Sequence, residues 1–217
     1  MVTHSSTAAG AYTAPVPKHF PNDSTDYLLL TWDDVMSSAI ALARRIVEHN
    51  GEYDRLITLG KGGWPLARIL ADLLQLPDAA SLGISFYDGL ERKEAPMLSQ
   101  ELPASISGQK VILVDDVVDS GDSIEFARKY LVDLGVKKVD TASLYYKPRS
   151  SYKPDFFAES TTAWIIFPHE YLEGIIGLTK KWQSKGVGQS EILRRLEKLE
   201  VPAEMLRYHV EIASLHT

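Results

Sequence analysis

The first apolar pattern in this chain repeats at helical spacing. Between Thr31 and Gly51, apolar residues recur at intervals of three and four and predict one amphipathic helix: Val35, Ala39, Leu42, Ala43 and Ile46. Thr31 and Asp34 have the spacing of a capping pair, so the helix is expected to begin just after Thr31.

Further along the chain, short apolar runs alternate with helical segments. Strands are predicted over residues 55–59, 82–86, 110–114 and 138–146, and helices from Pro65 to about Leu76 and from Gly121 to Leu134. The continuous run at 110–114 is typical of a strand buried on both faces of a parallel sheet. This alternation implies right-handed crossovers, so the predicted fold class is α/β, with a doubly wound, mainly parallel sheet.

The remaining segments have weaker patterns. Residues 1–26 are rich in Ser, Thr, Ala and Pro without an apolar period, which predicts a flexible or loosely docked arm. The polar stretch 87–100 has no regular period and is interpreted as a mobile lid or hood. Extra C-terminal helices are predicted over about 170–184, 190–199 and 203–215. The expected organisation is therefore an arm (1–26), a main domain with its hood (27–178) and a helical extension (179–217).

Composition narrows the function. The chain is 45% hydrophobic and 24% charged, as in globular proteins, and its net charge of −6 argues against a nucleic-acid binder. It contains no cysteine, which excludes disulfides and thiolate metal sites and favours the reducing cytoplasm. Neither a bilayer-spanning apolar segment nor a secretory signal is evident, so we expect a cytoplasmic protein without membrane contact.

Two adjacent carboxylates, Asp115 and Asp116, end the apolar run at 110–114. Such a pair can hold a divalent cation, bind sugar hydroxyls, cap a loop, or form the phosphoacceptor corner of a receiver domain. The residues that follow, Asp119-Ser-Gly-Asp-Ser123, bring hydroxyls, a glycine and backbone N–H groups to the start of a helix, which is the chemistry of a phosphate cradle. Neither a receiver corner nor a plain strand end requires that loop.

The run from Val111 to Ser123 resembles the phosphoribosyl diphosphate signature of type I phosphoribosyltransferases. The resemblance implies that Asp115 and Asp116 hold the ribose hydroxyls and bind Mg²⁺ partly through water and ligand. It also implies that five loop residues wrap the 5′-phosphate: Asp119, Ser120, Gly121, Asp122 and Ser123. Asp122 stands where purine enzymes often have glycine, and an acid so near a phosphate should point away from it.

A second glycine loop, made of Gly60, Lys61, Gly62 and Gly63, follows the strand at 55–59. It is neither a Walker loop nor a dinucleotide turn. It resembles the diphosphate-binding loop of the same family, in which a non-proline cis peptide is common, and Gly60–Lys61 is the candidate bond. Because ligands bind beyond the carboxyl ends of parallel strands, both loops should meet at one edge of the sheet. Arg92 or Lys93 of the hood is expected to reach the diphosphate.

Three later residues resemble the base pocket of the xanthine-guanine branch of purine phosphoribosyltransferases. By position, Lys147 is the donor to the 6-oxo group, Trp164 the stacking ring and Ile165 a backbone contact to the base edge. A lysine only donates hydrogen bonds, so it suits an oxo acceptor and not the amino group of adenine. His169 receives no ligand role.

The expected function is magnesium-dependent transfer of phosphoribosyl from phosphoribosyl diphosphate to a 6-oxopurine base, with Asp119 carrying the proton lost from the base. Xanthine, guanine and hypoxanthine are not ranked. The resemblance also implies a homo-oligomer, either a dimer or a tetramer. Two alternatives stay open: a noncatalytic regulator with this fold, and a phosphoribosyltransferase for another base.

Overall fold

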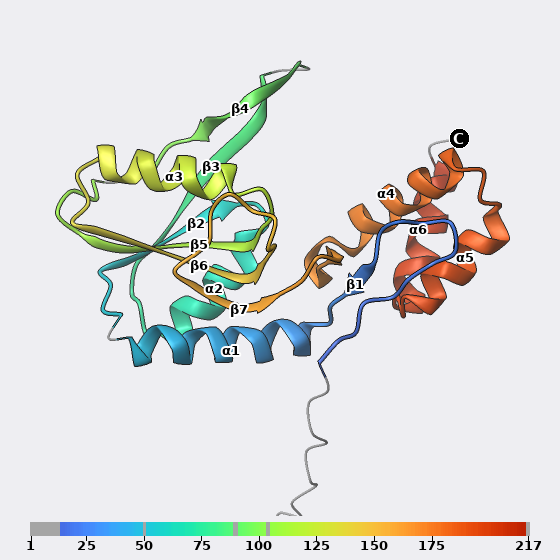
Figure 1. Ribbon diagram of the computed structural model, residues 1–217, viewed down its shortest axis with the longest axis horizontal. Coiled ribbons are helices and arrows are strands. Elements are labelled where there is room, and N and C mark those ends of the chain that lie inside the picture. Colours follow the sequence, from blue (N-terminus) through green and yellow to red (C-terminus); the bar gives the residue numbers. More distant parts are fainter. Residues whose placement is uncertain (1–13, 50, 89–90, 103–104, 216–217) are drawn as a thin grey trace, which may run out of the picture. The chain divides into compact units, whose positions relative to one another are not determined.

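The computed structural model describes residues 14–49, 51–88, 91–102 and 105–215, without the side chains of 86–95 and 213–215. The chain forms two compact units (Figure 1). One comprises residues 31–163. The other combines the segment that ends at Leu30 with everything from Trp164 onward. Both ends of the chain therefore belong to the same unit.

The first unit is built on a six-stranded sheet with the order β4-β3-β2-β5-β6-β7. Its strands are β2 (Arg55–Gly60), β3 (Ala79–Asp88), β4 (Glu91–Gln100), β5 (Lys110–Val118), β6 (Lys138–Tyr146) and β7 (Phe156–Ser160). All neighbours pair in parallel except β3 and β4, which are antiparallel. The predicted mainly parallel sheet is confirmed.

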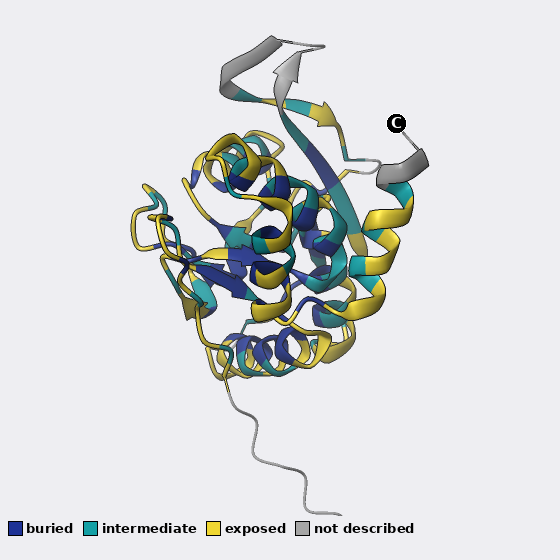
Figure 2. Ribbon diagram, turned by 90° about the vertical axis from the view of Figure 1, so that its right-hand side faces the viewer, coloured by how far each residue is buried: buried dark blue, intermediate teal, exposed yellow. Residues whose placement is uncertain are grey.

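Three helices cover this sheet, with α1 (Trp32–Glu48) and α2 (Gly63–Leu73) on one face and α3 (Asp122–Asp133) on the other (Figure 1). The predicted cap of α1 is present, since Asp34 N donates to Thr31 Oγ1 at 3.2 Å and Thr31 N donates to Asp34 Oδ2 at 2.7 Å. Strand β5 lies at the centre of the strand order, and its residues 111–114 are fully buried. Figure 2 shows buried residues gathered in the strands and on the inner sides of the helices. This burial explains the uninterrupted apolar run.

The prediction of an irregular stretch at 87–100 was wrong in its local structure, whereas its role as a hood stays a prediction. Residues 91–100 form β4, an edge strand that pairs with the lengthened β3. The pattern was weak because only one face of β4 is partly covered: Leu98 packs against the core beside Ile84, whereas Met97 is exposed. Residues 89 and 90 lie outside the described part of the chain. The short edge strand β7 was also absent from the prediction.

The second unit contains the two-stranded parallel sheet of β1 (Tyr27–Leu29) and β8 (Trp164–Ile166). After the short helix η1 (Pro168–Glu170) come the helices α4 (Tyr171–Ser184), α5 (Gln189–Lys198) and α6 (Ala203–Leu215). These bounds confirm the three predicted C-terminal helices. The described helices include none that is long and apolar enough to cross a membrane.

The division into units differs from the predicted boundaries. Helix α4 spans the expected limit between 178 and 179, yet it belongs wholly to the second unit. The first 13 residues of the predicted arm 1–26 lie outside the described residues. In the rest of that arm, Phe20 and Asp23 are buried, so it is not loosely docked.

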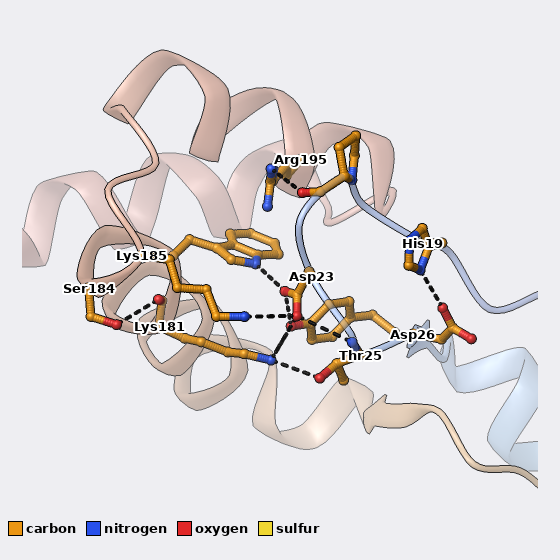
Figure 3. A network of polar contacts seen from close by, with 11 residues as sticks. His19, Asp23, Thr25, Asp26, Lys181, Ser184, Lys185 and Arg195 are labelled. Carbon is orange, nitrogen blue, oxygen red and sulfur yellow. Dashed lines mark hydrogen bonds and ion pairs between the residues drawn. The ribbon is translucent and has the colours of Figure 1, made fainter.

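A buried carboxylate fixes this N-terminal segment (Figure 3). Asp23 accepts hydrogen bonds from Tyr27 Oη at 2.6 Å, Trp182 Nε1 at 2.8 Å and Lys185 Nζ at 3.1 Å, and Lys181 Nζ lies 3.3 Å away. We call these five residues the Asp23 clasp. No local sequence pattern indicates this clasp, because Trp182 is separated from Asp23 by 159 positions.

The clasp changes the acidity of Asp23. Burial alone would raise the pKa of this carboxyl, but the hydrogen bonds from Tyr27, Trp182 and Lys185 outweigh burial and hold the pKa well below its usual range. A carboxylate with a lowered folded-state pKa stabilises the fold above its unfolded-state pKa, which is about 3.9. That contribution is lost as the pH falls through the folded-state pKa.

We predict that Asp23→Asn lowers the free energy of unfolding by about 3 kcal/mol at pH 7, near the lower end for breaking a buried ion pair, because both lysines can still reach water. The difference from wild type should narrow as the pH falls below about 4. Denaturant unfolding at several pH values checks this. The control is Asp26→Asn, which removes an exposed partner of His19 and should change stability little. Equal losses in both variants would contradict the role of the clasp.

Candidate active site

The predicted acidic pair lies near the carboxyl end of β5, where Asp116 is buried. Backbone groups hold both carboxylates: Val117 N donates to Asp116 Oδ1 at 2.7 Å, and Asp116 N donates to Asp115 Oδ1 at 3.1 Å. Burial, together with the neighbouring charge of Asp116, raises the pKa of Asp115 well above its usual range. A bound cation or a set of hydroxyl donors would therefore stabilise the charged form of this pair.

The loop after β5 leads directly into α3, whose first residue is Asp122. Gly121 has φ +99°, a left-handed conformation that favours glycine, and a Cβ there would lie 2.7 Å from Ser150 Oγ. The loop borders a cavity of about 220 Å³, lined by Asp115, Val117, Val118, Asp119, Ser120, Gly121, Ser123 and Ile124. With the amides and dipole of the α3 N-terminus beside it, this cavity has the chemistry of an anion site.

The hydroxyl of Ser120 already makes a hydrogen bond within the loop. Ser120 Oγ donates to Asp122 Oδ2 at 2.8 Å, so the carboxylate that was expected to point away from a phosphate is bonded within the loop. For Ser120 to donate to a phosphate, its hydroxyl must turn away from Asp122.

The segment after β6 is hydrogen-bonded to this loop. Ser151 donates to the Ser120 carbonyl through both its N–H and its hydroxyl, each at 2.9 Å, and Lys147 N donates to Val118 O at 2.9 Å. Arg149 donates to Asp119 Oδ1 from Nη2 at 2.6 Å and from Nε at 3.0 Å. Sequence reasoning missed Arg149, which is separated by 30 positions from Asp119 and has no local motif of its own.

The glycine loop of residues 60–63 lies beside the acidic pair. It joins β2 to α2, and the predicted cis peptide between Gly60 and Lys61 is present. A Cβ on Gly62 would stand 2.5 Å from Asp116 Oδ2, and one on Gly63 would stand 3.0 Å from Val114 O. Because β2 and β5 are parallel neighbours, both loops leave the same edge of the sheet and meet there.

The three predicted base-pocket residues are divided between the units. Lys147 belongs to the sheet unit, is only 4% exposed and donates from Nζ to the Ala163 carbonyl. Burial lowers the pKa of Lys147, opposed by the negative charge of Asp119. Trp164 and Ile165 lie on β8 in the second unit, where Trp164 is 41% exposed and Ile165 is buried.

Comparison with known proteins decides the family. A model described as "Phosphoribosyl transferase domain" matches residues 29–172, which include both glycine loops, the acidic pair and β8. The chain belongs to this family. Its relatives include xanthine-guanine phosphoribosyltransferases, which it matches across most of their length.

One such relative is the xanthine-guanine phosphoribosyltransferase of Idiomarina loihiensis, which is 26% identical over 154 residues, covering 68% of this chain and 92% of the relative. The bifunctional protein PyrR of Thermosynechococcus vestitus is 36% identical over 117 residues, covering 49% of this chain and 64% of PyrR. The crystal structure of purine phosphoribosyltransferase from Pyrococcus horikoshii is 30% identical, covers 65% of this chain and 92% of its own, and gives a TM-score of 0.59.

The phosphoribosyltransferase supplies only part of the ligands that a magnesium ion needs. Carboxylate oxygens are the ligands that Mg²⁺ prefers, and Asp115 and Asp116 supply them. Across the described ranges, no group of three or more His, Asp or Glu side chains could hold a metal ion. A magnesium ion at this site would therefore take its other ligands from water and substrate.

The predicted hood contact stays a prediction. Arg92 lies on β4, where its backbone pairs with Tyr87, but its side chain and that of Lys93 lie outside the described residues.

We predict that Gly62→Ala weakens binding of phosphoribosyl diphosphate at least tenfold, because the new Cβ must displace the Asp116 carboxylate or the loop. Isothermal titration with the sugar diphosphate and Mg²⁺ measures this. Gly188→Ala is the matched control, since a Cβ there has no neighbour within 4 Å among the described residues. Unchanged affinity in Gly62→Ala would show that this contact does not matter for binding.

Proposed function

We propose that the protein transfers the 5-phosphoribosyl group from phosphoribosyl diphosphate to a 6-oxopurine base and releases diphosphate. The observation that carries the proposal is the close approach of Gly62 to the Asp116 carboxylate. Because β2 and β5 are parallel, the loop of residues 60–63 and the loop after β5 lie at one edge of the sheet, with the acidic pair beside them. A substrate with a phosphate at one end and a diphosphate at the other can span these loops.

Each loop would hold one end of the donor. The amides of residues 119–123 receive the 5′-phosphate at the start of α3, and residues 60–63 receive the diphosphate. Asp115 and Asp116 accept hydrogen bonds from the ribose hydroxyls. Their negative charge also stabilises the positive charge that develops on the ribose as its bond to diphosphate breaks. Magnesium, when bound, neutralises charge on the leaving diphosphate.

The reaction requires no covalent nucleophile. The bond between ribose C1 and the diphosphate oxygen breaks, a purine nitrogen bonds to C1, and the purine loses one proton. Asp119 is the proposed acceptor of that proton. Its carboxylate is held by two hydrogen bonds from Arg149, which fix its direction before the base arrives.

Selection of the base would depend on Lys147, Trp164 and Ile165. Lys147 has three N–H donors, of which the Ala163 carbonyl takes one, so an oxo group of the base can accept another. A site built around such a donor rejects bases that present an amino group there. Trp164 would stack on the purine, with the Ile165 backbone at its edge. Similarity to xanthine-guanine enzymes supports this choice.

In a second candidate function, the protein acts on another base or regulates without catalysis. The chain is also similar, over about half of its length, to proteins named bifunctional protein PyrR, so its relatives are not all xanthine-guanine enzymes. An assay of base use separates the two candidates.

We expect diphosphate release when the protein is incubated with phosphoribosyl diphosphate, Mg²⁺ and xanthine, guanine or hypoxanthine, and not with adenine, uracil or orotate. Coupled detection of diphosphate measures the rate, and chelation of magnesium should abolish it. Release with a pyrimidine alone would support an enzyme for another base. No diphosphate release with any base would support a noncatalytic regulator.

The proton-transfer role of Asp119 has its own test. We predict that Asp119→Asn lowers kcat by about 100-fold or more, the lower range for loss of a general base, and changes the affinity for phosphoribosyl diphosphate by less than about threefold. Asp133→Asn, at the exposed far end of α3, is the control and should leave both unchanged. If Asp119→Asn lowers kcat and affinity in parallel, Asp119 only binds the donor.

A further inference from the structure

Trp164 is held by the N-terminal segment. Its strand β8 pairs with β1, with Trp164 opposite Tyr27, and Trp164 N donates to Asp26 O at 2.8 Å. The two rings lie 5.9 Å apart at an angle of 40°. The ring predicted to stack on the base is thus attached to a segment that lies outside the phosphate-binding sheet unit.

Helix α4 contacts the same indole. A Cβ on Gly177 would lie 3.8 Å from Trp164 Cη2, an ordinary van der Waals distance, so this turn of α4 faces the ring. Four positions along the helix, Lys181 places its Nζ over the ring, 5.7 Å from the centroid. Positions i and i+4 lie on one face of a helix, so α4 supports the indole at two successive turns. Trp164 nevertheless remains 41% exposed.

The ammonium group of Lys181 is fully used within the protein. Its Nζ lies 2.6 Å from Tyr27 Oη, 2.9 Å from Thr25 Oγ1 and 3.3 Å from Asp23 Oδ1. A lysine has three N–H donors, so these three acceptors leave none for a substrate. Lys181 therefore acts through the groups it contacts.

We propose that Lys181 is a positioning residue for base binding. Its ammonium group contacts Asp23 and Tyr27 of the Asp23 clasp (Figure 3). From α4 it lies over the indole of Trp164, and it fixes the orientation of this ring before a purine binds. This inference rests on the proposed function, because it assumes that Trp164 stacks on the base. The proposal gives a function to the N-terminal segment and to α4, both of which lie outside the sheet unit.

The physical reason is preorganisation. A ring that is fixed before binding loses little freedom when the base stacks on it, whereas a ring that rotates freely must be ordered at that moment. The cation over one face also resists rotation of the indole. Loss of Lys181 should therefore raise the KM for the base and leave the affinity for phosphoribosyl diphosphate unchanged.

The test compares three lysines of α4. Lys181→Met keeps the aliphatic stem but removes the charge that lies over Trp164. Lys185→Met removes the other lysine that contacts Asp23. Its Nζ lies 3.1 Å from Asp23 Oδ1, and the residue lies one turn farther along α4. Lys180→Met removes an exposed neighbour. All three are assayed by thermal unfolding and by steady-state kinetics with each 6-oxopurine.

We expect the KM for the base to rise about fivefold in Lys181→Met, the size of an exposed cation–π contact, and to recover partly in Lys181→Arg. Lys185→Met should lower stability through the clasp without this rise, and Lys180→Met should change neither quantity. Equal rises in KM for Lys181→Met and Lys185→Met would show that Lys181 only stabilises the unit and would overturn the proposal.

A second readout does not need catalysis. The contribution of Trp164 to fluorescence anisotropy is isolated by subtracting the same protein with Trp164→Phe, in the absence of substrate. We expect Trp164 to become more mobile and easier to quench with acrylamide in Lys181→Met and not in Lys185→Met. An unchanged Trp164 signal would overturn the proposal even if the protein accepts 6-oxopurines. A changed signal without turnover of any base would support the preset ring and reject the proposed function.

Discussion

The site depends on the parallel pairing of β2 with β5. Each strand leads into a loop that contains glycine, and parallel neighbours bring their carboxyl ends to the same edge of the sheet. The contact is so close at Gly62 that no side chain fits between the loop and the Asp116 carboxylate. The two proposed anion sites and the acidic pair therefore share one edge because of one strand register. Neither loop alone would distinguish a phosphoribosyl donor from other phosphates.

Much of this arrangement was predictable because it is encoded locally. The buried run of β5, the glycines after β2 and the helical periods each lie within a few residues of the element they define, and the bounds of β6, α3 and α4 agree with the prediction within about two residues. The cis peptide between Gly60 and Lys61 was expected only because the loop resembles the family's diphosphate-binding loop.

What the sequence could not predict depends on distant partners or on half-covered surfaces. Asp23 looks like any polar residue of a loose segment until α4 supplies Trp182 and Lys185, more than 150 positions away. Arg149 likewise has meaning only beside Asp119. Strand β4 escaped detection because an edge strand with one partly covered face has little periodic signal. Asp122 was expected to point away from a phosphate, and the sequence alone did not indicate that its carboxylate accepts a hydrogen bond from Ser120.

The second unit is assembled from both ends of the chain, and this has a consequence for biosynthesis. Strand β1 emerges early from the ribosome, but its partner β8 and the helix that pairs with Asp23 are made more than 130 residues later. The sheet unit, which is continuous in sequence, can therefore fold first, while the Asp23 carboxylate of the N-terminal segment stays hydrated until α4 is made. A chain that stops before α4 would contain both loops and the acidic pair but not the Lys181 that lies over Trp164. Premature termination would thus separate the proposed donor site from the proposed support of the base-stacking ring.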